Sequence, residues 1–178
     1  MRCTPFLALL ALAAALTVSP VQAQGTGAPR RNVVIFVADG LRSAVVTDET
    51  APELAAVRRD GVDFANSHSL YPTVTTPNAS AIATGHGLGD TGDFSNQLYV
   101  APALGIPVNA LVAPVEDDAV IRLLNDRYGG NYLNEVSLLA AARAAGYQTA
   151  VVGKLGPVAV QDATGLSTGA GVIIDDVT

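Results

Sequence analysis

Two threonines beside a proline are the residues of this sequence whose types and spacing best suit chemistry. Residues 71–78 read YPTVTTPN, and Pro77 fits the first position of a helix, where a missing N–H group costs nothing. Gly85 is suited to end that helix in a left-handed conformation. Thr75 and Thr76 would then lie at the positive end of the helix dipole, where backbone N–H groups can hold an anion. A hydroxyl in this position is either a helix cap or a nucleophile, and the local pattern leaves both interpretations open.

Asp39 and Asn96 each follow a distinctive segment. Residues 32–38 read NVVIFVA, a continuous apolar run rich in β-branched residues, which predicts a strand buried on both faces of a parallel sheet. Asp39 follows directly, at the place where open α/β sheets bind their ligands, although an aspartate there can also serve as a turn or cap residue. Asn96 closes the glycine-rich segment 85–96, which lacks the Gly-Lys-Ser/Thr ending of a phosphate-binding P-loop.

The elements that must position these residues alternate along the chain. Apolar spacing, with glycines after the helix ends, predicts helices over residues 51–60, 116–128 and 135–145, the last with Asn134 as its N-cap. Short apolar runs predict further strands over residues 62–65, 148–152 and 172–174. This alternation of strands and helices predicts an α/β fold with a largely parallel sheet.

The first 23 residues predict a cleaved signal peptide. Arg2 precedes an apolar run over residues 6–18, and Val21-Gln22-Ala23 provides the small residues that a signal peptidase requires. The run is too short and too rich in alanine to be a good membrane span. We therefore expect a periplasmic or secreted protein with no stable membrane span after cleavage, and an uncleaved anchor is the alternative. Residues 24–31 are expected to form a linker, and residues 32–178 the remaining domain.

Charge and cysteine content exclude several classes of function. The chain of 178 residues carries a formal net charge of −6, and Lys154 is its single lysine. It has no basic stripe, so we expect no nucleic-acid-binding surface. The single cysteine, Cys3, lies in the predicted signal peptide, so the mature chain is expected to have neither disulfides nor thiolate ligands for zinc.

Taken together, these motifs resemble the alkaline phosphatase superfamily, and more closely its type I phosphodiesterase/nucleotide pyrophosphatase branch. Asp39-Gly40 resembles the metal-binding end of the first strand in that branch, and residues 72–78 fit its Pro-Thr-x-Thr-x-Pro-Asn nucleophile pattern at every fixed position. Residues 81–85 (AIATG) resemble the helix that follows, and Asn96 stands where the branch has an asparagine that contacts a phosphate oxygen. The resemblance covers residues 32–99 well.

The resemblance implies a fold, a reaction and site residues. The fold would be an alkaline-phosphatase-like three-layer sandwich with a mostly parallel central sheet, incomplete in this chain. The reaction would be metal-dependent hydrolysis of phosphodiester or nucleotide pyrophosphate bonds in a small-molecule phosphoester or nucleotide. Thr75 would be the nucleophile and a metal ligand, Asp39 a ligand of the same metal, and Asn96 a substrate-binding residue. Zinc is the implied cofactor, with two divalent ions in the complete enzyme, and Thr76 is left as the helix cap.

Other ligands that the resemblance requires have no counterpart in the expected patterns. His68 and His86 are expected to be loop residues or residues that support a ligand, and Asp175 and Asp176 are weaker alternatives as ligands. Lys154 is expected to belong to the scaffold, with a phosphate contact as the alternative. We therefore expect the chain to be the N-terminal part of a longer enzyme.

Three alternatives stay open. The chain could be a non-catalytic exported domain that binds an anion at the helix start over residues 76–78. It could instead be a phosphomonoesterase or another phosphoryl-transfer enzyme of the same superfamily. It could also fail to fold alone, because part of a large parallel sheet leaves unpaired edges and uncovered apolar faces.

Overall fold

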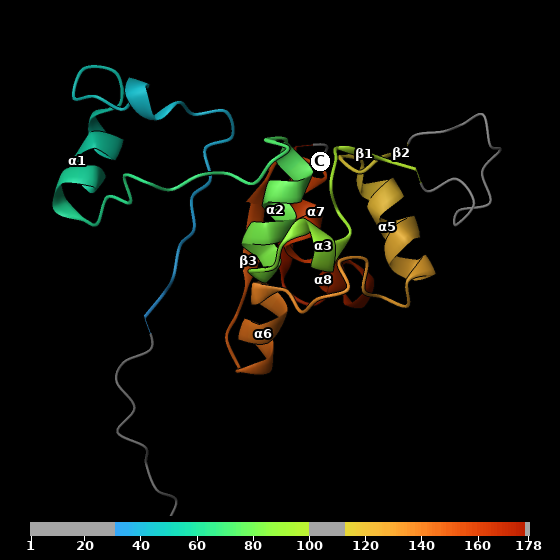
Figure 1. Ribbon diagram of the computed structural model, residues 1–178. Coiled ribbons are helices and arrows are strands. Elements are labelled where there is room, and N and C mark those ends of the chain that lie inside the picture. Colours follow the sequence, from blue (N-terminus) through green and yellow to red (C-terminus); the bar gives the residue numbers. More distant parts are fainter. Residues whose placement is uncertain (1–30, 100–112, 177–178) are drawn as a thin grey trace, which may run out of the picture. The chain divides into compact units, whose positions relative to one another are not determined.

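The computed structural model describes residues 31–99 and 113–176, and the chain divides into two units, residues 1–38 and residues 39–178. The predicted signal peptide over residues 1–23 and all but the last residue of the predicted linker lie outside the described residues. The helices and strands described below all belong to the second unit (Figure 1).

The predicted strand over residues 32–38 is wrong. These residues form neither helix nor strand, and their apolar side chains are exposed to solvent, Phe36 to 76%. A run of β-branched residues favours an extended backbone, but a strand forms only where a neighbour supplies a ladder of hydrogen bonds. The strands in the described parts of the chain pair only among themselves, as two separate pairs. The short strand predicted over residues 62–65 is wrong for the same reason.

Local signals place the first helices of the second unit. A short 3-10 helix, η1 (Ser43–Val45), is followed by α1 (Pro52–Asp60), which confirms the helix predicted over residues 51–60. Pro52 stands in the first turn of α1, where its fixed φ suits a helix start.

The helix that carries the two threonines begins earlier than predicted. α2 (Thr75–Thr84) has Val74 as its N-cap, so Pro77 stands inside the first turn rather than at its start. Proline is tolerated there because the first N–H groups of a helix have no partner within it. The helix ends at Gly85 as predicted, with a left-handed φ of 75°. α3 (Leu88–Thr91) follows within the glycine-rich segment.

Side-chain caps fix two helices in the middle of the chain. After β1 (Gln97–Leu98) and its antiparallel partner β2 (Ala113–Pro114), α5 (Asp118–Arg127) confirms the helix predicted over residues 116–128. α6 (Leu138–Ala144) is shorter than predicted, because its N-cap is Ser137 and not Asn134. Asn134 has a φ of 58°, whereas an N-cap residue needs an extended backbone.

The last part of the second unit is a strand–helix–strand arrangement. β3 (Ala150–Gly153) and β4 (Val172–Asp175) confirm the last two predicted strands, with bounds shifted by one or two residues. They pair in parallel, and α7 (Pro157–Gln161) and α8 (Ala163–Thr168) connect them. The structure is therefore a mixed helix and strand fold with a small parallel sheet, which is compatible with the α/β class.

The core positions the start of α2. α2 packs against α7, and α5 packs against α8 (Figure 1). The cluster of buried apolar residues that forms the core comes from these helices and from the segments beside them: Ala79, Ala83, Leu98, Val115, Ile121, Leu124, Tyr132, Leu133, Ala159, Val160 and Leu166. Within the described residues, no helix is both long enough and apolar enough to cross a membrane.

Candidate active site

Thr75 and Asp39 lie side by side at the start of α2. The Thr75 hydroxyl donates to Asp39 Oδ2 at 3.4 Å, although 36 residues separate the two in sequence. Thr75 is half-buried and Asp39 is exposed, so solvent reaches the pair. The structure thus brings together the two residues that the sequence marked as nucleophile and metal ligand.

Asn96 is held against the same turn of the helix. Its Oδ1 accepts a hydrogen bond from the backbone N–H of Thr76 at 2.9 Å. This bond directs the carbonyl end of the side-chain amide at the helix, and the –NH2 end is the group that can donate to a ligand oxygen.

Thr76 does not cap the helix, contrary to the prediction. It is fully buried, and its hydroxyl donates to the carbonyl oxygen of Ser95 at 2.8 Å and lies 3.3 Å from Asp93 Oδ1. Because α2 starts at Thr75, the two threonines occupy successive helical positions and point about 100° apart. One hydroxyl therefore faces Asp39 and the other faces the interior.

Asp93 is a buried carboxylate behind the threonine pair that sequence reasoning missed. It accepts hydrogen bonds from Thr76 and from Ser80, one turn further along α2. Burial raises the pKa of Asp93 above its ordinary value, and these hydroxyls oppose the shift. Tyr132 lies beside it, and burial, followed by the charge of Asp93, raises the pKa of the tyrosine well above its usual range. The signal in the sequence was the pair of hydroxyl residues spaced four apart on one face of the helix.

The expected anion site at the helix start has fewer donors than predicted. The N–H group of Thr76 is already bonded to Asn96, and Pro77 has no N–H group. Asn78 is also committed: its Nδ2 donates to the carbonyl of Val74 at 2.8 Å, and its Oδ1 accepts from the N–H of Leu70 at 2.8 Å. The first turn of α2 therefore offers a bound phosphate fewer backbone and side-chain donors than predicted.

Lys154 contributes a positive charge beside Asp39. Its Nζ lies 2.8 Å from Glu116 Oε1 and 3.8 Å from Asp39 Oδ2, at the end of β3. The hydrogen bond that the Lys154 ammonium donates to Glu116 raises the pKa of Lys154, partly opposed by desolvation. The prediction that Lys154 belongs to the scaffold missed this contact, because its partner Glu116 is 38 residues away in sequence.

The oxygen donors at the site fit part of a metal coordination sphere. Asp39 Oδ2 and Thr75 Oγ1 are adjacent oxygen atoms of the kind that zinc and other divalent cations accept. Within residues 31–99 and 113–176, no group of three or more histidine, cysteine, aspartate or glutamate side chains is arranged to hold a metal. The described residues therefore offer two oxygen atoms that could bind a metal, and not a complete set of ligands.

The two histidines contact residues other than Asp39 and Thr75, and Asp176 bonds the backbone beside Lys154. His68 Nε2 lies 3.0 Å from Asn66 Oδ1. His86 Nδ1 lies 3.5 Å from Asp90 Oδ2, and His86 Nε2 lies 3.6 Å from Glu135 Oε2. Asp176 Oδ1 accepts from the N–H group of Leu155 at 2.8 Å. These contacts agree with the expectation that the histidines are loop residues.

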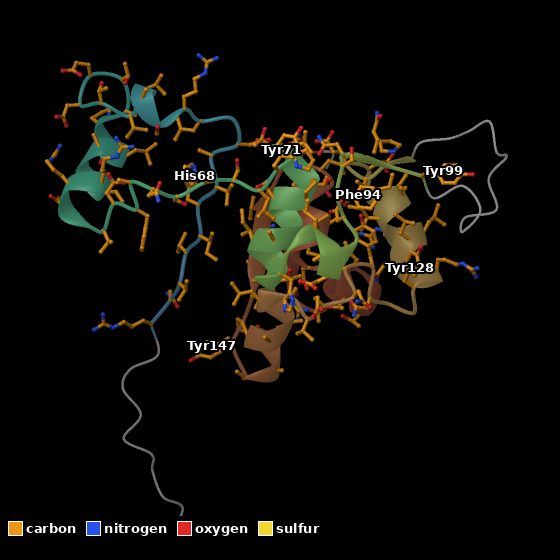
Figure 2. All side chains as sticks on the ribbon, in the orientation of Figure 1. His68, Tyr71, Phe94, Tyr99, Tyr128 and Tyr147 are labelled. Atoms are coloured by element: carbon orange, nitrogen blue, oxygen red, sulfur yellow. The ribbon has the colours of Figure 1, made fainter. Side chains whose placement is uncertain are left out.

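A separate pocket of about 750 Å³ lies between α3, β1 and α5. Four of its twelve lining residues are aromatic, and three of these, Phe94, Tyr99 and Tyr128, are labelled in Figure 2. Asp39, Thr75 and Asn96 do not line it.

Comparison with protein-family models finds a match to the family described as type I phosphodiesterase / nucleotide pyrophosphatase, over residues 33–160. The matched range includes Asp39, Thr75, Asn96 and Lys154. It confirms the resemblance that the sequence motifs indicated. Searches of curated proteins and of solved structures gave no significant match.

Proposed function

Because this chain belongs to the type I phosphodiesterase/nucleotide pyrophosphatase family, we propose that it hydrolyses phosphodiester or nucleotide pyrophosphate bonds with Thr75 as the nucleophile. The observation that carries this proposal is the contact between Thr75 Oγ1 and Asp39 Oδ2 at 3.4 Å, at the accessible start of α2. The family points to a hydrolase of phosphodiester bonds, and the contact identifies a hydroxyl beside a carboxylate that could supply the chemistry.

The reaction follows from the position of the threonine. Thr75 Oγ forms a bond to phosphorus while the bond from phosphorus to the leaving-group oxygen breaks. In the net step the hydroxyl proton goes to that oxygen, so the leaving group departs as an alcohol or a phosphate. Water then hydrolyses the resulting phosphothreonine ester and restores the hydroxyl. An unassisted threonine hydroxyl is a weak nucleophile at neutral pH, so its deprotonation has to be favoured locally.

Asp39 and Thr75 are the residues that would hold a metal ion. The family is generally metal-dependent, and zinc is the ion that we propose, with two divalent ions in the complete site. When bound, such an ion would favour the alkoxide form of the hydroxyl and polarise a phosphoryl oxygen.

Asn96 is proposed to bind the substrate phosphate. Since its carbonyl oxygen accepts from Thr76 N–H, its –NH2 group is held beside the same helix turn as Thr75. A donor fixed in this way is oriented toward charge that develops on a phosphoryl oxygen without reorganising during the reaction.

The non-catalytic alternative has less support. It requires an anion at the helix start over residues 76–78, where Thr76 N–H is bonded to Asn96 and Pro77 has no N–H.

The hydrolase proposal has two further elements. They are export to the periplasm or beyond and the alkaline-phosphatase-like sandwich fold.

Hydrolysis of bis(4-nitrophenyl) phosphate by the full chain, with zinc present, tests the proposal. Thr75→Ala is expected to lower kcat by on the order of 10³-fold or more. Thr84→Ala is the matched control, because Thr84 stands at the opposite end of the same helix, where its hydroxyl donates to the carbonyl of Ser80 and accepts from the N–H of His86. Turnover in Thr75→Ala equal to that of the control would reject the nucleophile. Faster release of 4-nitrophenolate from the monoester 4-nitrophenyl phosphate than from the diester would instead favour a phosphomonoesterase.

A further inference from the structure

Lys154 is a cation whose contacts the proposed reaction does not use. Its ammonium and the Thr75 hydroxyl approach the same atom, Asp39 Oδ2, at 3.8 Å and 3.4 Å. A metal ion held by Asp39 and Thr75 would bind the same carboxylate. The ammonium therefore competes with a metal for the negative charge of Asp39.

A stronger partner lies on the other side of the ammonium. Glu116 Oε1 is 2.8 Å from Lys154 Nζ, a shorter contact than the one to Asp39. Asp176 adds a further negative charge nearby. When the contact to Asp39 is lost, the ammonium keeps its bond to Glu116.

The turn between β3 and α7 fixes the lysine beside Glu116. The N–H of Leu155 donates to Asp176 Oδ1 at 2.8 Å, and the N–H of Gly156 donates to Asp118 Oδ1 at 2.9 Å. Gly156 has a φ of 76°, and a Cβ atom there would lie 2.3 Å from the Cα of Glu116. The backbone of the turn is thus pressed against residue 116, so Lys154 is tethered there.

We propose that Lys154 is a tethered counter-cation of Asp39 that sets the affinity of the site for a divalent metal, and that Glu116 retains the ammonium when the metal binds. This inference rests on the proposed function, since it takes Asp39 and Thr75 as the metal ligands. It makes Lys154 a positioning residue that acts through Asp39.

The effect on affinity is modest, because the pair is exposed. The side chains of Lys154 and Asp39 are 50% and 59% exposed. An exposed ion pair contributes at most about 1 kcal/mol, which corresponds to about a fivefold change in a dissociation constant. We therefore expect Lys154→Met to bind zinc roughly fivefold more tightly than the wild type.

Zinc titration of the full chain against a chromophoric chelator, at fixed ionic strength, measures this affinity without any turnover. Lys154→Arg keeps the charge and is expected to bind zinc as the wild type does. Arg127→Gln removes a positive charge from the end of α5 and should also leave the affinity unchanged. Far-UV circular dichroism of each variant without metal verifies that it is folded.

A double-mutant cycle with Glu116→Gln separates two effects of Glu116 on zinc binding. One is its retention of the Lys154 ammonium, and the other is direct attraction between its carboxylate and the metal ion. In the wild type, Glu116→Gln should weaken zinc binding, because Lys154 then has Asp39 as its close partner. In the Lys154→Met background, the same change should have no effect. An equal loss of zinc affinity in both backgrounds would show that Glu116 acts only by attracting the metal ion, and would overturn its proposed role in retaining the ammonium.

The outcomes also distinguish this inference from the proposed function. Zinc binding by the wild type with the same affinity in Lys154→Met would overturn the role of Lys154 and leave the hydrolase proposal standing. If Lys154→Met binds zinc more tightly than the wild type but neither protein hydrolyses a phosphodiester, the role of Lys154 is supported and the hydrolase proposal is rejected. Absence of zinc binding in every variant would overturn the metal site and Lys154 together.

Discussion

Replacing each of the two neighbouring threonines by valine should separate stability from activity. Thr76→Val removes a hydroxyl that is fully buried and that donates to the carbonyl of Ser95 at 2.8 Å, with Asp93 Oδ1 at 3.3 Å. The change removes one donor, which the carbonyl of half-buried Ser95 and the buried Asp93 carboxylate share. Loss of one such donor costs about 1–3 kcal/mol, so we expect a destabilisation of about 2 kcal/mol. For a protein of this size, the melting temperature should fall by about 4–8 °C.

Thr75→Val is the matched comparison for this experiment. Thr75 is half-buried. Within the described part of the chain, its hydroxyl makes one hydrogen bond, the long contact to Asp39 Oδ2 at 3.4 Å. Such a bond contributes little, and we expect a change below about 0.5 kcal/mol together with loss of hydrolysis. Urea unfolding followed by circular dichroism measures both variants. A Thr76→Val variant as stable as the wild type, or a Thr75→Val variant that loses more stability than Thr76→Val, would refute the assignment of inward and outward hydroxyls.

Two further predictions concern buried charges. Burial raises the pKa of Asp93, so the folded protein holds this proton more tightly than the unfolded chain does, and stability falls as the pH rises from the ordinary aspartate range through the raised pKa. Asp93→Asn should lose this dependence, which urea titrations at a series of pH values would reveal as a smaller fall than in the wild type. Arg143→Met should cost about 3 kcal/mol in urea unfolding, because it leaves Asp162, which is 1% exposed, without the guanidinium that binds both its oxygens at 2.5 and 2.7 Å. Arg127→Met, at the exposed end of α5, is the control and should stay within about 0.5 kcal/mol of the wild type.

Sequence reasoning succeeded where the signal was local. α1 and α5 lie within their predicted ranges, since a proline in the first turn and an acidic cap mark helix starts without help from the rest of the chain. The left-handed Gly85 likewise ends α2 as predicted. β3 and β4 were found because short apolar runs separated by helical residues are typical of parallel strands.

Sequence reasoning failed where a prediction depended on a distant partner or on the residue at which a helix begins. Residues 32–38 have the composition of a buried strand but no strand to pair with among the described residues. Thr76 was taken as the cap because Pro77 follows it, yet a start two residues earlier turns its hydroxyl inward. At the site, the family pattern indicated Asp39, Thr75 and Asn96. The contact of Lys154 with Glu116 spans 38 residues, and no local rule predicts it.

The packing of α2 against α7 has a consequence for the order in which the protein is made. Gln161 Nε2 donates to the carbonyl of Ala79 at 2.9 Å, across 82 residues of sequence. A ribosome that adds about 5–20 residues per second needs several seconds to add that length of chain. During this interval the face of α2 that carries Ala79 and Ala83 has no α7 to cover it. The support for Thr75 is therefore completed late in synthesis, and the first turn of α2 gains its final environment only after a residue far downstream has emerged.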